Sequence, residues 1–286
     1  MSCFSRRRFL SYSGLASVGL ISLTWAKETR HEDPKRKFKK GVGLVTKPSS
    51  SWFFNLESLR VDWHYSWGLK KPKDYPPNIS FVPMVWGPGG LEEAVKYINE
   101  HKEEDDVDCL LGFNEPDEQG QSNIPVERAL ELWPTLMEAK VRLGSPACVH
   151  PDNEWMKKFM HEVDRRQLRV DFVTIHDYGG PSPEALIQKC RKIHEMYSRP
   201  VWITEFAVGD WQAKDVKEHR HSPQRVLEFM QAVLPELDML DCVERYAWFP
   251  ASKDNSHLGT SALFEDDGTL TPLGRYYADY ESQIPV

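Results

Sequence analysis

Two glutamates stand where a carboxylate could take part in catalysis. Glu115 lies at the end of the apolar run Leu110–Asn114, and Glu205 ends the run Val201–Thr204. A carboxylate at the rim of an apolar wall can have its ionisation tuned, and two carboxylates that face one bound sugar can divide the roles of proton donor and nucleophile. The pair therefore indicates glycosidase chemistry.

Polar side chains next to these acids are candidates for binding or orienting a sugar. Asn114 directly precedes Glu115 and could donate a hydrogen bond to a sugar hydroxyl. His176 and Tyr178 follow another apolar run with a spacing of two, which places both on one face of a strand. There the tyrosine hydroxyl could hold the nucleophile while the histidine orients it. The alternative is a buried core histidine and a packing tyrosine.

Several tryptophans lie at or just beyond the ends of the expected strands, where their flat faces suit the C–H faces of sugar rings. Trp63 and Trp202 lie within strands and are expected to be structural. We predict that Trp248 forms the floor of the cleavage subsite. The candidates are Trp67, Trp86, Trp211 and Trp248.

The elements that must position these residues alternate between short apolar runs and longer segments of helical period. This alternation predicts parallel strands joined by crossover helices. The expected strands are Gly41–Thr46, Val61–Trp67, Ile79–Trp86, Asp108–Asn114, Arg142–Ala147, Asp171–His176, Pro200–Thr204 and Val243–Trp248, and the helices between them include Leu91–Glu100, Val126–Ala139, Glu154–Gln167, Pro183–Tyr197 and Pro223–Leu234.

Eight strand–helix units in about 245 residues match the size of a (β/α)8 TIM barrel better than that of an open, doubly wound sheet. We therefore predict an α/β fold with a single barrel over residues 41–286. Chemistry in a barrel collects at the carboxyl ends of the strands. Alone, Glu115 could be a helix N-terminal acid and Glu205 a loop acid paired with a surface base. Their joint placement on strands four and seven, roughly opposite each other, favours catalysis.

Six segments in order resemble the glycosyl hydrolase catalytic core group classified as glycoside hydrolase family 128. The similarity spans nearly all of Gly41–Tyr280. The segments are Phe81–Gly87, Leu110–Asp117, Leu143–Ala147, Val170–Gly179, Trp202–Ala207 and Tyr246–Phe249.

The resemblance implies a retaining endo-β-1,3-glucanase that acts on laminarin-type chains without a cofactor. Glu115 matches the family's acid/base, Glu205 its nucleophile and Trp248 the aromatic residue of the eighth strand. Asp177 departs from the pattern, because an aromatic residue is expected between the histidine and the tyrosine of the sixth strand, and a third carboxylate there would alter a sugar subsite. The matching supporting positions are Asn114, His176 and Tyr178.

The composition excludes other classes of function. The chain has 286 residues, 40% of them hydrophobic, and a formal net charge of −7, so it can bury a large core. No basic cluster beyond Lys35–Lys40 is dense enough for a nucleic-acid groove, and we expect no nucleic-acid partner. The run that begins at Gly87 lacks the spacing of a phosphate-binding loop, which argues against nucleotide cofactors.

The first 26 residues have the features of a twin-arginine-type signal peptide. Arg6, Arg7 and Arg8 precede an apolar stretch from Leu10 to Leu23, and small residues flank Trp25 before a cleavage site expected after Ala26. We predict export to the periplasm or the medium, with no stable membrane association once the signal is cleaved; an uncleaved anchor is the alternative. Residues 27–40 are charged and are predicted to be a solvated linker.

The cysteines beyond the signal form neither a C-x-x-C pair nor a dense framework, so we expect no structural zinc and no other metal. Cys109, Cys148 and Cys190 are interpreted as small buried hydrophobic residues. The expected partner is a polysaccharide or oligosaccharide, and the protein is expected to be a monomer. Two further hypotheses stay open, namely a β-glucan-binding protein with little or no hydrolysis and a barrel glycosidase that acts on mannan, galactan or xylan.

Overall fold

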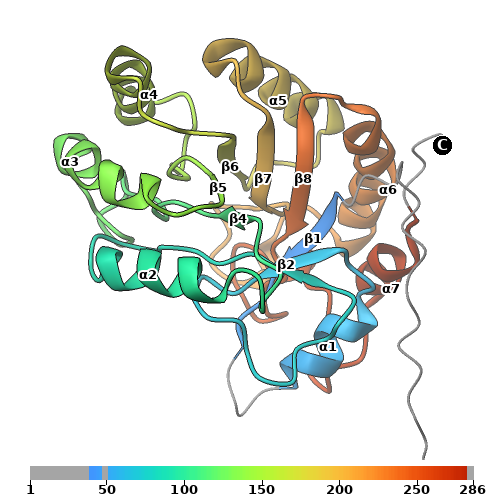
Figure 1. Cartoon of the computed structure of the whole chain (residues 1–286). Helices are drawn as coiled ribbons and strands as arrows, with labels where there is room; N and C mark the ends of the chain where they lie inside the picture. The colour runs from blue at the N-terminus through green and yellow to red at the C-terminus, as the bar shows by residue number, and fades with distance from the viewer. Residues whose placement is uncertain (1–38, 47–50, 282–286) are drawn as a thin grey trace, which may run out of the picture. The chain divides into compact units, whose positions relative to one another are not determined.

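Eight parallel strands follow one another along the chain in the computed structural model, which describes residues 39–46 and 51–281 (Figure 1). All eight expected strands are present, and most of them are shorter than the apolar runs that predicted them. They are β1 (Lys40–Gly43), β2 (Trp63–Tyr65), β3 (Ser80–Phe81), β4 (Cys109–Leu110), β5 (Arg142–Leu143), β6 (Val173–Asp177), β7 (Val201–Phe206) and β8 (Val243–Trp248).

The strands close into a barrel in chain order. Six of them pair side by side in the order β3-β2-β1-β8-β7-β6, and β4 pairs with β5. Parallel bridges join these two groups on both sides, from Met84 to Leu111 and from Gly144 to Phe172. The pairing of β1 with β8 completes the ring, so the predicted (β/α)8 barrel is confirmed.

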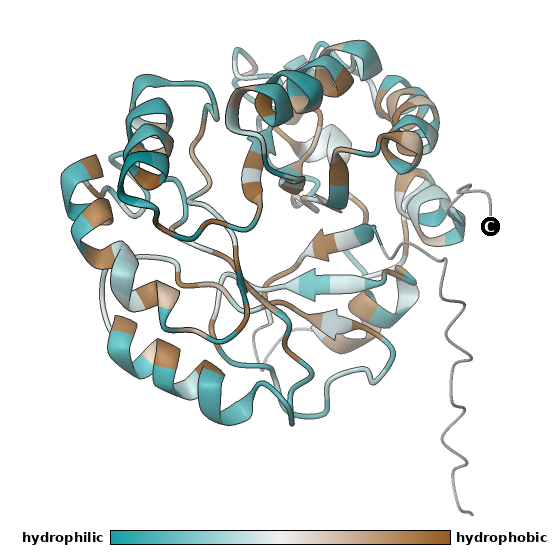
Figure 2. Ribbon diagram, turned by 45° about the horizontal axis from the view of Figure 1, so that its top comes forward, coloured by the Kyte–Doolittle hydropathy of each residue, from teal (hydrophilic) through white to brown (hydrophobic). Residues whose placement is uncertain are grey.

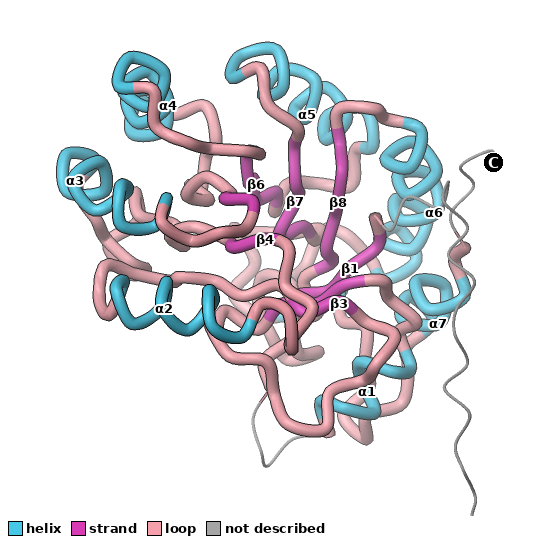
Figure 3. The backbone as a smooth tube through the Cα atoms, in the orientation of Figure 1, coloured by secondary structure: helices cyan, strands magenta, loops and turns pink. Residues whose placement is uncertain are grey.

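The helices lie outside the strands (Figure 3). Three of them begin with a serine or threonine cap followed by proline, as at Ser182, Ser222 and Thr271. Residues 66–79, between β2 and β3, contain no helix, so the second strand–helix unit is incomplete. The helices are α1 (Trp52–Ser58), α2 (Leu91–His101), α3 (Val126–Met137), α4 (Glu154–Arg166), α5 (Pro183–Tyr197), α6 (Pro223–Met239) and α7 (Pro272–Asp279), with short 3-10 turns at Val216–Glu218 and Gly259–Ser261.

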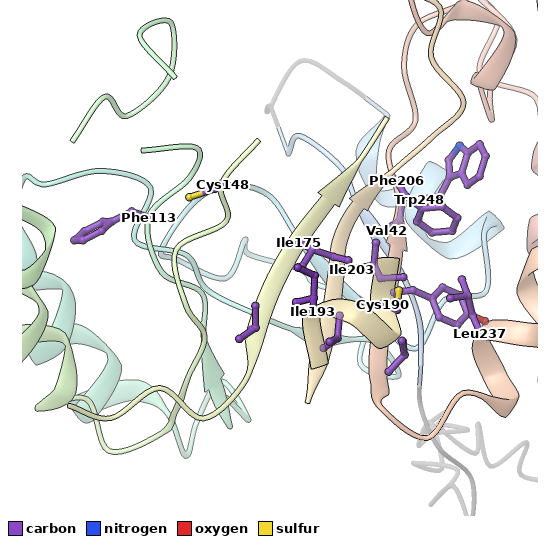
Figure 4. Packing of buried hydrophobic residues seen from close by; sticks show 14 of the residues in the cluster. Val42, Phe113, Cys148, Ile175, Cys190, Ile193, Ile203, Phe206, Leu237 and Trp248 are labelled. Carbon is purple, nitrogen blue, oxygen red and sulfur yellow. The ribbon is translucent and has the colours of Figure 1, made fainter. Parts of the chain in front are cut away.

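The hydrophobic core has two layers, one inside the barrel and one between the strands and the helices. Trp63 and Trp202 lie in the inner layer and are buried, which confirms the structural role predicted for them. Phe206 and Trp248 lie in the outer layer, where Figure 4 shows them packed together. The helices carry hydrophobic residues (brown in Figure 2) among hydrophilic ones (teal). Their buried residues recur at helical spacing, as expected for a stripe that faces the core.

The barrel begins earlier than the sequence indicated. Lys39 and Lys40, predicted to belong to a solvated linker, are only 1% and 7% exposed, and β1 starts at Lys40. Each ammonium donates hydrogen bonds to carbonyl oxygens at the end of a helix, which stabilises the helix terminus. The acceptors are Leu237, Asp238 and Leu240 at the end of α6 for Lys39, and Tyr277, Ala278 and Tyr280 at the end of α7 for Lys40.

The cysteines of the described residues are free thiols, and Cys109, Cys148 and Cys190 are buried as predicted. Within residues 39–46 and 51–281, no helix combines the length and the apolar character needed to cross a membrane. The signal-peptide prediction for residues 1–26 lies outside the described residues.

Candidate active site

A cavity of about 980 Å³ lies where the carboxyl ends of the strands meet. Both candidate acids line it, together with every other candidate site residue except Trp248. The candidate residues that line the cavity are Trp67, Trp86, Asn114, Glu115, His176, Tyr178, Glu205 and Trp211.

Glu205 reaches the cavity because β7 contains one extra residue between Ile203 and Phe206. From Ile203 to Phe206, β7 advances by three residues, while the segments of β6 and β8 paired with it advance by two residues. Ile203 and Phe206 both pack in the outer layer. Such a bulge re-aims a side chain, and here it lets Glu205 face the cavity and pair in register with His176.

Three hydrogen-bond donors surround the Glu205 carboxylate, which is itself buried. The Tyr65 hydroxyl and Trp67 Nε1 donate to Oε1 over 2.9 and 2.8 Å, and the Tyr178 hydroxyl donates to Oε2. Burial, reinforced by the Glu205 charge, raises the pKa of Tyr65 and Tyr178 well above the ordinary value. Both hydroxyls therefore keep their protons, and the three donors orient the carboxylate and suit its ionised form.

His176 links the two acids. Its Nδ1 lies 2.9 Å from Glu115 Oε1, and its Nε2 lies 3.5 Å from Glu205 Oε1. Burial lowers the pKa of His176, but the charges of Glu205 and Glu115 and the hydrogen bond to Glu115 together raise it above its usual value. One carboxylate oxygen of Glu115 and one of Glu205 lie within 4.8 Å of each other. The imidazole thus bonds to Glu115 and stands beside Glu205 without a hydrogen bond to it, and the two acids are close enough to act on one glycosidic bond.

Asn114 and Glu115 are adjacent and yet both line the cavity. Glu115 has φ +40°, in the left-handed region, which breaks the alternation of a regular strand. A non-glycine residue held there costs about 1–3 kcal/mol, and such strain concentrates at functional sites. The Asn114 amide nitrogen donates to Gln121 Oε1 over 3.4 Å, while its buried Oδ1 has no partner among the described residues. The hydrogen bond that the sequence predicts from Asn114 to a sugar hydroxyl therefore stays a prediction.

The exposed tryptophans form part of an apolar wall. Trp86 is 39% exposed and Trp211 is 60% exposed. Trp211 is held at the rim by a 3.0 Å hydrogen bond from its Nε1 to the carbonyl oxygen of Tyr178. Both rings therefore keep surface with which to stack on a sugar.

The prediction that Trp248 forms the floor of the cleavage subsite is wrong. Its ring has no exposed surface, packs 4.9 Å from Phe206 and donates from Nε1 to Ser261 O. From Tyr246 on, successive residues of β8 alternate between the two sides of the barrel wall, so Ala247 faces inward and Trp248 faces the helices. Phe249 lines the cavity instead.

Sequence reasoning missed several lining or contacting residues. Tyr65 precedes Trp67 by two residues, so the same-face spacing that selected His176 and Tyr178 would have found it. Asp177 is absent from the lining, and its carboxylate pairs with Lys189 of α5, which does line the cavity. The missed lining residues are Val45, Glu118, Gln121, Val149, His150, Gly179, Lys189, Phe249 and Leu258.

The geometry excludes the surface-pair alternative for Glu205 and argues against a metal site. Glu205 is not a loop acid paired with a surface base, because its partners are interior aromatic and imidazole groups. Glu115, His176 and Glu205 are close enough to hold a metal ion. Both oxygens of Glu205 already accept hydrogen bonds, however, and His176 Nδ1 bonds to Glu115, so this donor set fits proton and nucleophile chemistry better than metal ligation.

Comparisons with known proteins agree with this arrangement. A family model described as "Glycosyl hydrolase catalytic core" matches residues 41–277. A subgroup I GH128 endo-beta-1,3-glucanase from Amycolatopsis mediterranei, crystallised with laminaripentaose, superposes with a TM-score of 0.71 at 30% identity, covering 85% of this chain and 99% of that one. A subgroup III curdlan-specific exo-beta-1,3-glucanase from Blastomyces gilchristii, in complex with glucose, gives 0.65 at 27% identity, covering 85% and 98%.

A curated relative, Alkali-sensitive linkage protein 1 of Schizosaccharomyces pombe, is 26% identical over 263 residues. The match covers 84% of this chain but only 44% of that protein, so the chain spans less than half of its length.

Proposed function

The chain belongs to the glycosyl hydrolase catalytic core family, within glycoside hydrolase family 128, and from this premise we propose that it is a retaining endo-β-1,3-glucanase. The observation that carries the mechanism is the separation of the two acids. Retaining glycosidases hold their carboxyl groups about 5–5.5 Å apart, and inverting ones about 6.5–9.5 Å apart, to leave room for a water molecule. One oxygen of Glu115 lies within 4.8 Å of one oxygen of Glu205, and this close approach of the two carboxyl groups supports retention.

In the first step, Glu205 attacks the anomeric carbon while Glu115 gives its proton to the glycosidic oxygen. The bond to the leaving sugar breaks, and a glycosyl ester of Glu205 forms. The hydrogen bonds from Tyr65, Trp67 and Tyr178 hold the attacking carboxylate in place before the reaction. They weaken as its charge is lost in the ester.

In the second step, Glu115 acts as the base. It removes a proton from water, which attacks the same carbon, releases Glu205 and restores the original configuration. His176 bonds to Glu115 through Nδ1 and places its Nε2 beside Glu205, so it orients the Glu115 carboxyl group and adds a favourable charge next to Glu205. It is a positioning residue, since it acts through the two acids.

The aromatic lining supports a β-1,3-glucan as the substrate. Trp67, Trp86, Trp211 and Phe249 line the cavity, and each ring that stacks on a sugar adds on the order of 1 kcal/mol. The relatives crystallised with laminarin oligosaccharides point to the same substrate class.

Product analysis on matched oligosaccharides tests the proposal. The protein should cleave laminarihexaose at internal bonds and leave cello-, manno- and xylo-oligosaccharides intact, and NMR should show the β-anomer as the first product. Release of glucose alone would indicate exo action, and a β-1,4 preference would refute the substrate while leaving the two-glutamate mechanism intact. Tight binding of laminarihexaose without turnover would show a binding protein instead.

We further propose that the protein is exported as a monomer by a twin-arginine-type route. The support is the order of Arg6, Arg7 and Arg8, the apolar stretch and the small residues before Ala26. Residues 27–38 would then connect the signal to the barrel.

A further inference from the structure

The cavity has two sides of different chemistry. The aromatic side comprises Trp67, Tyr178, Trp211 and Phe249, and it adjoins Glu205, to which Trp67 and Tyr178 donate hydrogen bonds. The Phe249 ring lies 5.8 Å from that of Trp67 and 5.5 Å from that of Tyr178. These rings form a continuous apolar surface beside the nucleophile.

The polar side comprises Glu118, Gln121, His150 and Lys189, and it adjoins Glu115. Glu118 and Gln121 follow Glu115 in the connection from β4 to α3, and Gln121 also accepts from Asn114. His150 follows the segment after β5 that contains Ala147, whose carbonyl oxygen accepts from the backbone N–H of Glu115 over 2.7 Å.

Two hydrogen bonds accepted by the Asp117 carboxylate connect these loops. Asp117 accepts from the backbone N–H of Val149 over 3.1 Å and from the Asn153 amide over 2.6 Å. The two loops that carry Glu118, Gln121 and His150 are therefore held in a fixed relation to the acid Glu115.

Lys189 lies on the face of α5 that borders the loop of His150. Its ammonium pairs with Asp177, and Lys192, three residues later on the same face of the helix, pairs with Asp152 of that loop. The Lys189 side chain is 35% exposed and that of Asp177 12%, so the pair is partly shielded from water. An ammonium has three N–H donors, and the bond to Asp177 leaves others for a ligand. Among the described residues that line the cavity, only Lys189 carries an ammonium or guanidinium group.

We infer that the polar side binds the leaving-group part of the glucan by hydrogen bonds, with Lys189 as a specificity-determining residue. This inference rests on the proposed function. A general acid protonates the oxygen of the leaving group, so the leaving sugar must lie on the side of Glu115. That side offers donors and acceptors for hydroxyl groups, whereas the glycone meets the aromatic side.

Two substrates with the same glycone and different leaving groups distinguish the contribution of the polar side from that of the aromatic side. In 4-nitrophenyl β-laminaritrioside the leaving group is a nitrophenol, whereas in laminarihexaose it is a sugar chain. The quantity of interest is the ratio of kcat/KM on laminarihexaose to kcat/KM on the nitrophenyl substrate. Lys189→Met should lower this ratio roughly tenfold, since it removes a charge-assisted hydrogen bond made only to a sugar leaving group.

Three further variants provide controls. Lys189→Arg should recover part of the lost ratio, because it keeps a charged donor. Trp211→Ala should lower kcat/KM on both substrates by similar factors, since it acts on the glycone. Lys192→Met removes a lysine of the same helix that is 58% exposed, pairs with Asp152 and lies outside the cavity, and it should leave the ratio at the wild-type value.

The outcomes distinguish a failure of this inference from a failure of the proposed function. Equal losses on both substrates in Lys189→Met, with a melting temperature like that of the wild type, would overturn the inference and leave the proposed function standing. If Lys189→Met fails to fold, Gln121→Ala gives the same test, and an unchanged ratio there would overturn the inference. A wild-type protein that cleaves neither substrate would overturn the proposed function and this inference together.

Discussion

Trp248→Ala is expected to destabilise the barrel rather than to alter its cavity. The indole has no exposed surface and packs against Phe206, Phe229 and Tyr277. Truncation of a buried tryptophan to alanine costs about 3–5 kcal/mol. The loss of its hydrogen bond leaves the Ser261 carbonyl oxygen unpaired, which adds roughly 1 kcal/mol. At about 2–4 °C per kcal/mol, the melting temperature should fall by about 10 °C or more.

Urea unfolding followed by circular dichroism measures this loss, and kcat/KM per folded molecule, at a temperature where the variant stays native, measures the cavity. The matched variant is Phe249→Ala at the next position, whose ring lines the cavity. It should lower kcat/KM about five- to tenfold, equivalent to about 1 kcal/mol of stacking, with a smaller loss of stability. If Trp248→Ala kept wild-type stability and lost activity, the assignment of Trp248 to the outer layer would be refuted.

Three further predictions concern mechanism, acid stability and export. Glu205→Gln should abolish turnover of every substrate because no nucleophile remains. Glu115→Gln should still form the glycosyl ester from a substrate with a dinitrophenyl leaving group, which needs no proton, and burst kinetics would show this. Identical behaviour of the two variants on that substrate would contradict the assigned roles. Burial lowers the pKa of His64 to about 4, so the unfolded chain takes up the proton first as the pH falls below 6.5. The free energy of unfolding should therefore drop by about 3 kcal/mol by pH 4. Urea titrations at several pH values should show this drop in the wild type and not in His64→Phe. If both proteins lose the same free energy of unfolding between about pH 6.5 and pH 4, His64 is not its cause. Replacement of Arg6 and Arg7 by lysine should leave the precursor in the cytoplasm, and fractionation that finds the variant outside the cell would show that another route exports it.

The barrel could be predicted because its signals are local. Each strand is an apolar run, each helix carries a stripe of helical period, and pairs such as Ser182-Pro183 mark where helices begin. The barrel places its strand ends at one mouth, so the order of strands alone brought Glu115, His176 and Glu205 to one region. The boundary at Lys39 and Lys40 was missed, because their partners lie 198 or more positions away in the chain.

The chemical type and strand position of the two glutamates were therefore determined by the sequence alone, whereas the direction of individual side chains was decided by the tertiary structure. Direction depends on register: one extra residue in β7 turns Glu205 inward, and alternation at the end of β8 buries Trp248 in the outer layer while Phe249 lines the cavity. It also depends on contacts between distant segments, such as the Tyr65 hydroxyl that bonds to Glu205 across 140 positions. A side chain's face is fixed only when neighbouring strands pair, because a shift of one residue moves it to the other side of the barrel wall.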